Sequence, residues 1–149
     1  MGSQSDYSVM RDCEKILRIL KIKYQASIVS AHRTPKRMFE FAESASKNGF
    51  AVIIAGAGGS AHLPGMVASL ATVPVIGVPI ESKTLKGLDS LLSIVQMPKG
   101  CPTATMAING AFNAGLHAAS IIGTFDLKVR SNLEKWKRLQ TKSVKKKIK

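Results

Sequence analysis

Apolar side chains follow two patterns along this chain, one helical and one typical of buried strands. In residues 7–20 they recur at i, i+4, i+7, i+8 and i+11, the spacing of a single helix face. Residues 50–55 and 73–78 are almost continuously apolar, as in strands that are buried on both faces. Shorter strands are expected at 23–29 and 103–108.

Helix signals separate these strands. Thr34-Pro35 predicts an N-cap followed by proline at the first helical position, and Asn48-Gly49 predicts the end of that helix. Strands that alternate with helices form right-handed βαβ units, so we expect an α/β fold with a parallel sheet between two helical layers. Further helices are expected from Leu63-Pro64 onward and at residues 85–97, 109–123 and 127–139.

The composition is that of an ordinary globular protein. With 149 residues, 45% of them hydrophobic, the chain is long enough for one sizeable core, and collagen-like or wholly disordered classes are excluded. We expect an α/β domain at 1–125, followed by a C-terminal helix and basic tail at 126–149. No apolar run approaches a membrane span and no secretory signal is evident. Cys13 and Cys101 form no disulfide framework, so a cytoplasmic location is expected.

The net charge of +13 is unevenly distributed, because residues 128–149 contribute +9 of it. Such a basic run can bind nucleic acid. However, no aromatic residue is interleaved with the lysines at 142–149 for base stacking. A solvated terminus is therefore the favoured interpretation, and nucleic-acid binding stays open as an alternative.

Candidate chemistry lies in the loops after the strands, since ligands of parallel α/β sheets bind at the carboxyl ends of the strands. Residues 2–6 offer backbone N–H groups and hydroxyls at a helix start, which suits a phosphate. Asp6 would accept from sugar hydroxyls, although Ser5 or Asp6 could simply cap the helix. In the second loop, Arg33 suits a phosphate or carboxylate, and His32 suits proton transfer near neutral pH. His62, which follows a glycine-rich loop, is a similar candidate for proton transfer, although a loop histidine that faces solvent can also be inert.

The glycine-rich loop also fits a dinucleotide fingerprint. Gly56 to Ala61 match G-x-G-x-x-[GA], and Glu81 follows at the spacing of the ribose-binding acid. Against this alternative, the motif lies in the third βα unit and the chain leaves no room for a substrate domain. The glycines otherwise permit close approach to a ligand or a neighbouring subunit.

Taken together, the loops carry a specific resemblance. The motifs are Gly2-Ser3-Gln4-Ser5-Asp6, Ser30-Ala31-His32-Arg33-Thr34-Pro35, and residues 55–66 and 87–98. From Gly2 to about Gly123 the chain resembles the class I N5-carboxyaminoimidazole ribonucleotide mutases, the catalytic subunits of phosphoribosylaminoimidazole carboxylase. The animal-type carboxylases have lysine after the loop histidine, so Arg33 favours the mutase class.

The resemblance implies a flavodoxin-like α/β/α sandwich that assembles as a homo-octamer with active sites near subunit junctions. It implies an isomerase of IMP biosynthesis, which moves a carboxylate from N5 to C4 of an aminoimidazole ribonucleotide by release and recapture of CO2. No metal or organic cofactor is implied. An ATP-dependent synthetase of the N5-carboxylated nucleotide is the implied functional partner.

The resemblance also assigns residues. His32 is the expected general acid/base, and Ser3, Asp6 and Arg33 bind the nucleotide. The expected substrate-binding set is completed by Ser5, Ser30, Gly58 and His62. The chemistry agrees, because one base with a near-neutral pKa can protonate N5 and later take the C4 proton.

One departure concerns the start of the chain. The family has a hydrophobic strand directly before Gly-Ser-x-Ser-Asp, and no such strand precedes Gly2 here. Its absence would leave unpaired backbone within the core, so either the chain is an incomplete version of a longer one or the protein is a weakened relative. The alternative function is a catalytically weakened relative that acts as an oligomeric or nucleic-acid-binding protein through its basic tail.

Overall fold

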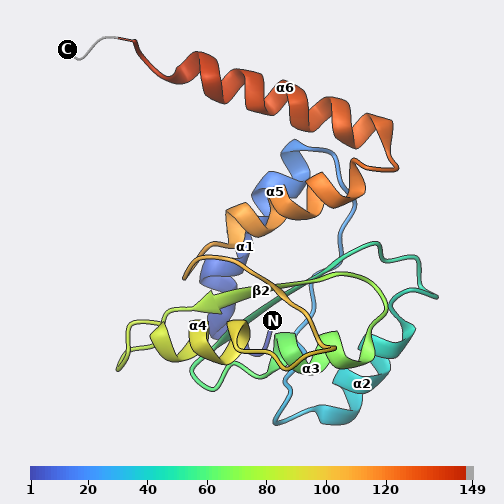
Figure 1. The fold of residues 1–149 in the computed structure, drawn as a ribbon, viewed down its shortest axis with the longest axis vertical. Helices are drawn as coiled ribbons and strands as arrows, with labels where there is room; N and C mark the ends of the chain where they lie inside the picture. Colours follow the sequence, from blue (N-terminus) through green and yellow to red (C-terminus); the bar gives the residue numbers. More distant parts are fainter. Residues whose placement is uncertain (147–149) are drawn as a thin grey trace.

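The computed structural model describes residues 1–146, in which helices alternate with parallel strands (Figure 1). The last three lysine-rich residues of the predicted tail, 147–149, lie outside the described residues. None of the helices within 1–146 is both long and apolar enough to cross a bilayer. The elements are the 3₁₀ helix η1 (Gln4–Asp6), α1 (Tyr7–Ile19), α2 (Pro35–Ser44), β1 (Ile53–Gly58), α3 (Leu63–Leu70), β2 (Val75–Ile80), α4 (Leu88–Val95), β3 (Ala104–Thr105), α5 (Ala111–Ile122) and α6 (Leu127–Ser143).

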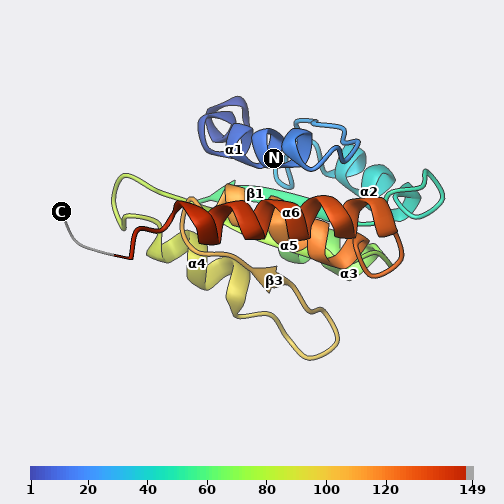
Figure 2. The same cartoon turned by 90° about the horizontal axis from the view of Figure 1, so that it is seen from above.

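The three strands form one parallel sheet in the order β1-β2-β3. Helices α1 and α5 cover one face, α2, α3 and α4 cover the other, and α6 lies across α5 (Figures 1 and 2). This arrangement confirms the predicted α/β/α class with a parallel sheet.

Side-chain alternation along the strands builds a core on each face. From β1, Ile53, Ala55 and Ala57 are buried against α2 and α3. From β2, Ile76, Val78 and Ile80 are buried in a second core with α1 and α5. A third cluster joins α1, α5 and α6, where the Phe112 and Trp136 rings lie 6.0 Å apart. Trp136 thus helps to pack α6 against α5.

The predicted strands at 50–55 and 73–78 are displaced toward the carboxyl end in the structure. Gly56 and Gly58, expected to form a turn, pair with Val78 and Ile80 in the β1–β2 ladder. Because Gly56 to Gly58 belong to a strand and do not open a helix, the segment does not form the dinucleotide fingerprint. β2 starts after Pro74, whose carbonyl accepts from the Ile53 N–H while its missing N–H costs no ladder bond.

Other element boundaries also differ from the prediction. β3 has two residues instead of the six expected at 103–108. Helix α2 ends at Ser44, ahead of the predicted stop at Asn48-Gly49, and α4 is shorter than 85–97. Helix α6 continues to Ser143, so part of the predicted basic tail is helical.

The strand predicted at 23–29 is wrong as a regular element, because the segment has too few backbone partners for a ladder. It is extended, and its neighbour is Met1: the Met1 ammonium donates to the Ser27 carbonyl (3.1 Å), and the Val29 N–H donates to the Met1 carbonyl (2.8 Å). On the other side of Met1-Gly2, the Gly2 N–H donates to the Gly56 carbonyl of β1 (3.1 Å). Met1-Gly2 therefore lies between the 23–29 segment and β1, and a cavity of about 470 Å³ adjoins it.

Candidate active site

Three loops meet at the carboxyl end of β1, and a hydrogen bond joins each pair of them. The Gly2 N–H donates to Gly56, as described above, and Arg33 Nη2 donates to the Gly2 carbonyl (3.3 Å). His32 Nε2 lies 2.9 Å from His62 Nδ1, which joins the second loop to the third. The structure thus brings together all three loops that the sequence singled out.

The first loop is shaped by Asp6, which is only 7% exposed. Its Oδ2 accepts from the Ser3 N–H (2.9 Å), which makes Asp6 the third residue of a capping box whose N-cap is Ser3. The predicted N-cap role of Asp6 is not realised, because its side chain makes no cap bond to α1. The Ser3 and Ser5 hydroxyls lie 2.6 Å apart and share a hydrogen bond. Two hydroxyls and a carboxylate are therefore held within one short loop.

In the second loop Ser30 positions Arg33. The buried Ser30 Oγ accepts from the backbone N–H (3.2 Å) and from Nε (3.4 Å) of Arg33. Thr34 Oγ1 closes the turn, since it accepts from the Ser30 N–H (2.9 Å) and donates to the Ser30 carbonyl (3.1 Å). Ser30, predicted to bind substrate, thus has its hydroxyl engaged with the guanidinium.

His32 and His62 form a pair of exposed imidazoles. Their rings are T-shaped, with centroids 5.0 Å apart and planes at 88°. In the hydrogen bond between Nε2 and Nδ1, one nitrogen must carry the proton and the other must accept it. The tautomer of each ring is therefore coupled to that of the other. Sequence reasoning named both residues but missed the pairing, because they lie thirty positions apart.

A cleft of about 600 Å³ opens beside the first and third loops. Of the predicted residues, it is lined by Ser3, Ser5, Asp6 and Gly58, whereas Ser30, His32, Arg33 and His62 lie outside its lining. Arg33 and the histidine pair connect to the cleft through Gly2 and through the 56–62 loop. Sequence reasoning missed a further set of lining residues, Glu81, Ser82, Lys83, Lys86 and Asn109.

Residues 81–86 directly follow the carboxyl end of β2. They therefore lie where ligands of parallel α/β sheets bind, as the predicted loops do. Lys83 and Lys86 place two positive charges in a lining that also holds the carboxylates of Asp6 and Glu81, so an anionic group of a ligand is favoured at the lysines. Asn109 holds the segment after β2, since its Oδ1 accepts from the Glu81 N–H (2.9 Å) and its Nδ2 donates to Glu81 Oε2 (3.1 Å). Glu81, which the dinucleotide alternative required for a ribose, is engaged with this side chain.

Ser90 fastens the glycine-rich loop to the sheet. It is fully buried; its Oγ donates to the Ile80 carbonyl (2.6 Å) and accepts from the Gly59 N–H (2.8 Å). Gly59 has a φ of 67°, which favours glycine. Nearby, the Ser82 hydroxyl donates to Asp89 Oδ1 (2.7 Å), and this bond lowers the pKa of the Asp89 carboxyl. Ser90 belongs to the 87–98 motif but received no predicted role.

Within residues 1–146, no group of three or more His, Cys, Asp or Glu side chains is arranged to hold a metal ion. The Cys13 thiol lies in the core, where burial raises its pKa to about 12, so it is protonated at neutral pH. The chemically competent groups at the loop junction are thus imidazole, guanidinium, carboxylate, hydroxyl and ammonium.

Comparison with known proteins agrees with this set of loops. A family model described as AIR carboxylase matches residues 1–143. The chain belongs to the AIR carboxylase family. Relatives named N5-carboxyaminoimidazole ribonucleotide mutase include that of Escherichia coli K12, which is 53% identical over 97% of this chain and 86% of its own length. The Thermotoga maritima mutase is 63% identical over 83% of this chain and 72% of its own.

A solved structure shows the same fold. Treponema denticola PurE superposes with a TM-score of 0.84 and 25% identity, covering 95% of this chain and 89% of that one. The flavodoxin-like sheet expected for the AIR carboxylase family is therefore confirmed. The match to the 52% identical Pyrococcus horikoshii mutase extends over all of this chain and 84% of the relative.

The Ser90 contacts generate a stability prediction. Ser90→Ala removes the side-chain partner of both the Gly59 N–H and the Ile80 carbonyl, so the free energy of unfolding should fall by about 1–3 kcal/mol. Ser120→Ala is the matched control, because the exposed Ser120 Oγ donates within its own helix, to the Leu116 carbonyl (3.1 Å). Urea denaturation of both variants measures the difference. Equal losses in the two variants would contradict the clamp role of Ser90.

Proposed function

We propose that this chain is an isomerase of purine biosynthesis that converts N5-carboxyaminoimidazole ribonucleotide to 4-carboxy-5-aminoimidazole ribonucleotide. Several relatives at 52–63% identity carry the name of this mutase. The observation that carries the proposal is the hydrogen-bonded junction of three loops, which links the histidine pair to the cleft that Lys83 and Lys86 line.

The cleft supplies the groups that a ribonucleotide substrate requires. Lys83 and Lys86 attract the phosphate, and the Ser3 and Ser5 hydroxyls can donate to its oxygens. The Asp6 carboxylate accepts from ribose hydroxyls. Arg33, oriented by Ser30 and Gly2, pairs with the carbamate or the phosphate in a bidentate manner. Gly58 lines the same cleft and contacts the ligand through its backbone.

The proton balance of the reaction requires one acid/base group. When the N5–carboxylate bond breaks and CO2 leaves, N5 must receive a proton. When C4 then bonds to the CO2 carbon, the C4 proton must leave, so the two transfers cancel. His32 performs both, with a contribution to the rate of about 10²–10⁴-fold. His62 fixes the tautomer of His32 through the bond between their ring nitrogens.

The glycine-rich loop has a containment role in this proposal. It presents backbone without bulky side chains next to the reacting atoms, and Ser90 holds it at Gly59. A fixed loop limits the escape of free CO2 between the two half-reactions.

Replacement of His32 tests the proposal. His32→Asn should lower turnover of the N5-carboxylated nucleotide by about 10²–10⁴-fold, because no other group at that position transfers the proton. Conversion to the C4-carboxylated product is followed spectrophotometrically. His117→Asn, at an exposed position of α5, is the matched control and should keep full activity.

A second substrate distinguishes the mutase from a direct carboxylase. The unchanged enzyme should use the N5-carboxylated nucleotide faster than the decarboxylated nucleotide supplied with bicarbonate. Turnover in His32→Asn close to that of the unchanged enzyme would refute the role of His32, and faster use of bicarbonate would refute the mutase assignment.

Assembly as a homo-octamer, with active sites near subunit junctions, is part of the proposal. An apolar stripe on α4 supports it, since Leu88 (51% exposed), Leu92 (47%) and Val95 (49%) lie at i, i+4 and i+7 on one helix face. Helix α4 buries Ser90 on its other side, so the stripe faces away from the sheet. A neighbouring copy seated there would cover the stripe.

The octamer is tested by sedimentation velocity. The unchanged chain should sediment as an octamer, and Leu88→Asp should shift it toward smaller species, because burial of an unpaired carboxylate disfavours the interface. Leu88→Met is the conservative control and should keep the assembly. A monomeric unchanged chain, or an octamer insensitive to Leu88→Asp, would contradict this part of the proposal.

The proposal includes a cytoplasmic location and an ATP-dependent synthetase that supplies the N5-carboxylated nucleotide. A substrate that is itself a carbamate requires an enzyme that activates bicarbonate for transfer to the nucleotide amine. The contacts of α6 within the described residues do not favour the alternative of a weakened relative that binds nucleic acid. Helix α6 packs on α5 through Val129 and Leu133.

A further inference from the structure

The loop that carries His32 and Arg33 is a closed turn, which begins at Ser30 and ends at Thr34. The Thr34 N–H donates to the Ser30 carbonyl (3.0 Å), and the Thr34 hydroxyl donates to the same carbonyl (3.1 Å). The Ser30 N–H donates to Thr34 Oγ1 (2.9 Å). Both backbone polar groups of Ser30 are therefore bonded to Thr34, and His32 is the middle residue of the turn.

Burial orients the side chains of this turn. Ser30 and Ala31 are both 7% exposed, and Ala31 belongs to the core cluster that α2 and α3 form with β1. The next two residues, His32 and Arg33, are exposed. Since Ala31 is held in the core, the directions of His32 and Arg33 depend on how the turn closes at Thr34.

Thr34 does not use its hydroxyl as a helix cap. It is the N-cap residue of α2, a position where a threonine hydroxyl commonly accepts from an N–H of the first helical turn. No such side-chain bond is present in α2, although the Thr34 carbonyl accepts from the Met38 N–H (3.1 Å) as the helix begins. The predicted N-cap position is therefore correct, whereas the side chain of Thr34 is bonded to the loop.

The Ser30 hydroxyl extends these contacts to the guanidinium. It accepts from the backbone N–H (3.2 Å) and from Nε (3.4 Å) of Arg33, so Thr34 holds Ser30 and Ser30 holds Arg33. Within residues 1–146, the His32 ring makes one hydrogen bond, which joins it to His62. The position of the His32 imidazole is thus set by His62 and by the backbone of the turn.

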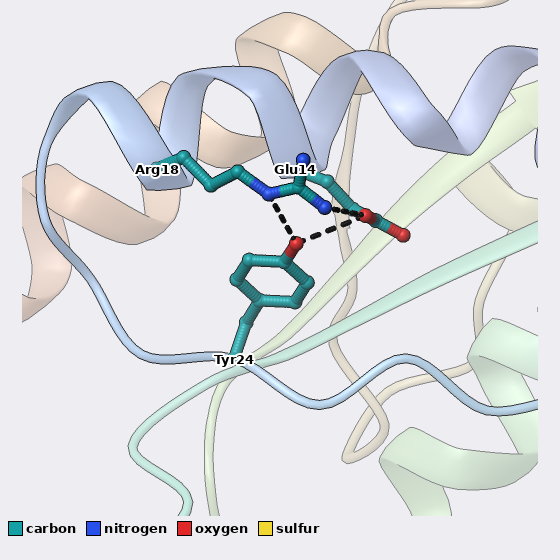
Figure 3. Close-up of polar contacts among 3 residues, drawn as sticks. All are labelled: Glu14, Arg18 and Tyr24. Atoms are coloured by element: carbon teal, nitrogen blue, oxygen red, sulfur yellow. Dashed lines mark hydrogen bonds and ion pairs between the residues drawn. The ribbon is translucent and has the colours of Figure 1, made fainter.

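A separate polar cluster fixes the segment that leads into the turn (Figure 3). The Tyr24 hydroxyl donates to Glu14 Oε2 (2.9 Å) and accepts from Arg18 Nε (2.7 Å). Arg18 Nη2 also donates to Glu14 Oε2 (2.9 Å). Glu14 and Arg18 belong to α1, so the cluster attaches Tyr24 to that helix, and none of its bonds reaches the turn. Tyr24 therefore offers a control hydroxyl in the same segment.

We propose that Thr34 is a positioning residue for the proton transfers at His32, an inference that rests on the proposed function. Its hydroxyl closes the turn at Ser30 and so fixes the backbone from which His32 and Arg33 extend. Without this hydroxyl the Ser30 N–H loses its partner, and because Ser30 is buried, the turn must rearrange to pair that N–H again. A misplacement of a reacting group by about 1 Å can lower a rate by about 100-fold.

The test compares variants of the full chain in turnover of the N5-carboxylated nucleotide. Thr34→Val keeps the shape of the side chain but removes both hydroxyl bonds to Ser30, so kcat should fall by about tenfold to 100-fold. KM should change less than kcat, because the cleft residues that hold the nucleotide do not depend on Thr34. Thr34→Ser keeps the hydroxyl, and Tyr24→Phe removes only the control hydroxyl, so both should keep the kcat of the unchanged chain.

The His62 imidazole resonances of the free protein, recorded by NMR, give a second measurement that requires no turnover. They should move in Thr34→Val, because a displaced His32 changes its bond to His62, and stay in place in Thr34→Ser and Tyr24→Phe. Circular dichroism checks that the variants are folded. If Thr34→Val does not fold, Thr34→Gly replaces it in both measurements, since glycine is tolerated at an N-cap.

Three results would overturn the proposal: a kcat of Thr34→Val close to that of the unchanged chain, equal losses of kcat in Thr34→Val and Tyr24→Phe, or His62 resonances that stay in place in Thr34→Val. A loss in Thr34→Ser as large as that in Thr34→Val would also contradict it. An unchanged chain without turnover refutes the proposed function, and the His62 resonances then still decide whether Thr34 positions the imidazole pair.

Discussion

The hydrogen bond from the Gly2 amide to the Gly56 carbonyl is the contact on which the proposed site most depends. It joins the start of the chain to the carboxyl end of β1, and the next bond, from Arg33 to the Gly2 carbonyl, adds the second loop. Both bonds use the backbone of one glycine. A displacement of Gly2 would therefore also displace Ser3, Ser5 and Asp6 relative to β1.

The remaining contacts make the junction stiff enough for chemistry. Ser90 ties the glycine-rich loop to the end of β2, and Ser30 orients the guanidinium of Arg33. Asn109 holds the segment after β2 through Glu81. The two loops that carry the imidazole pair are thus each held by further hydrogen bonds, one at Arg33 and the other at Gly59. Such positioning is a condition for accurate proton transfer.

The sequence predicted the layers, the parallel sheet and the three loops, because these follow from short-range signals. Apolar runs marked β1 and β2, and Pro35 and Pro64 marked the starts of two helices. The sequence predicted the end of β1 too early, because glycines in isolation are typical of turns. In the structure Gly56 and Gly58 pair with β2. The sequence also predicted a strand at 23–29, where pairing depends on a neighbour that local pattern does not show.

Within the candidate site, residue types were predictable and contacts were not. His32 and His62 were each recognisable from their loops, but their bond exists only because the chain returns to the same edge of the sheet. Ser90 is one serine among several in the 87–98 motif, and only its burial between Gly59 and Ile80 shows its role. No local motif marks Lys83 and Lys86, and only the fold shows that they line the same cleft as the first loop.

The central claim is that the histidine pair and the cleft beside the first loop serve one bound ribonucleotide. Imidazole resonances of the unchanged protein, recorded by NMR during titration with the 4-carboxylated product nucleotide, test it most directly. The account predicts that the His32 and His62 signals move together and saturate, while those of His117 stay in place. Saturable binding that leaves both His32 and His62 unmoved would contradict it.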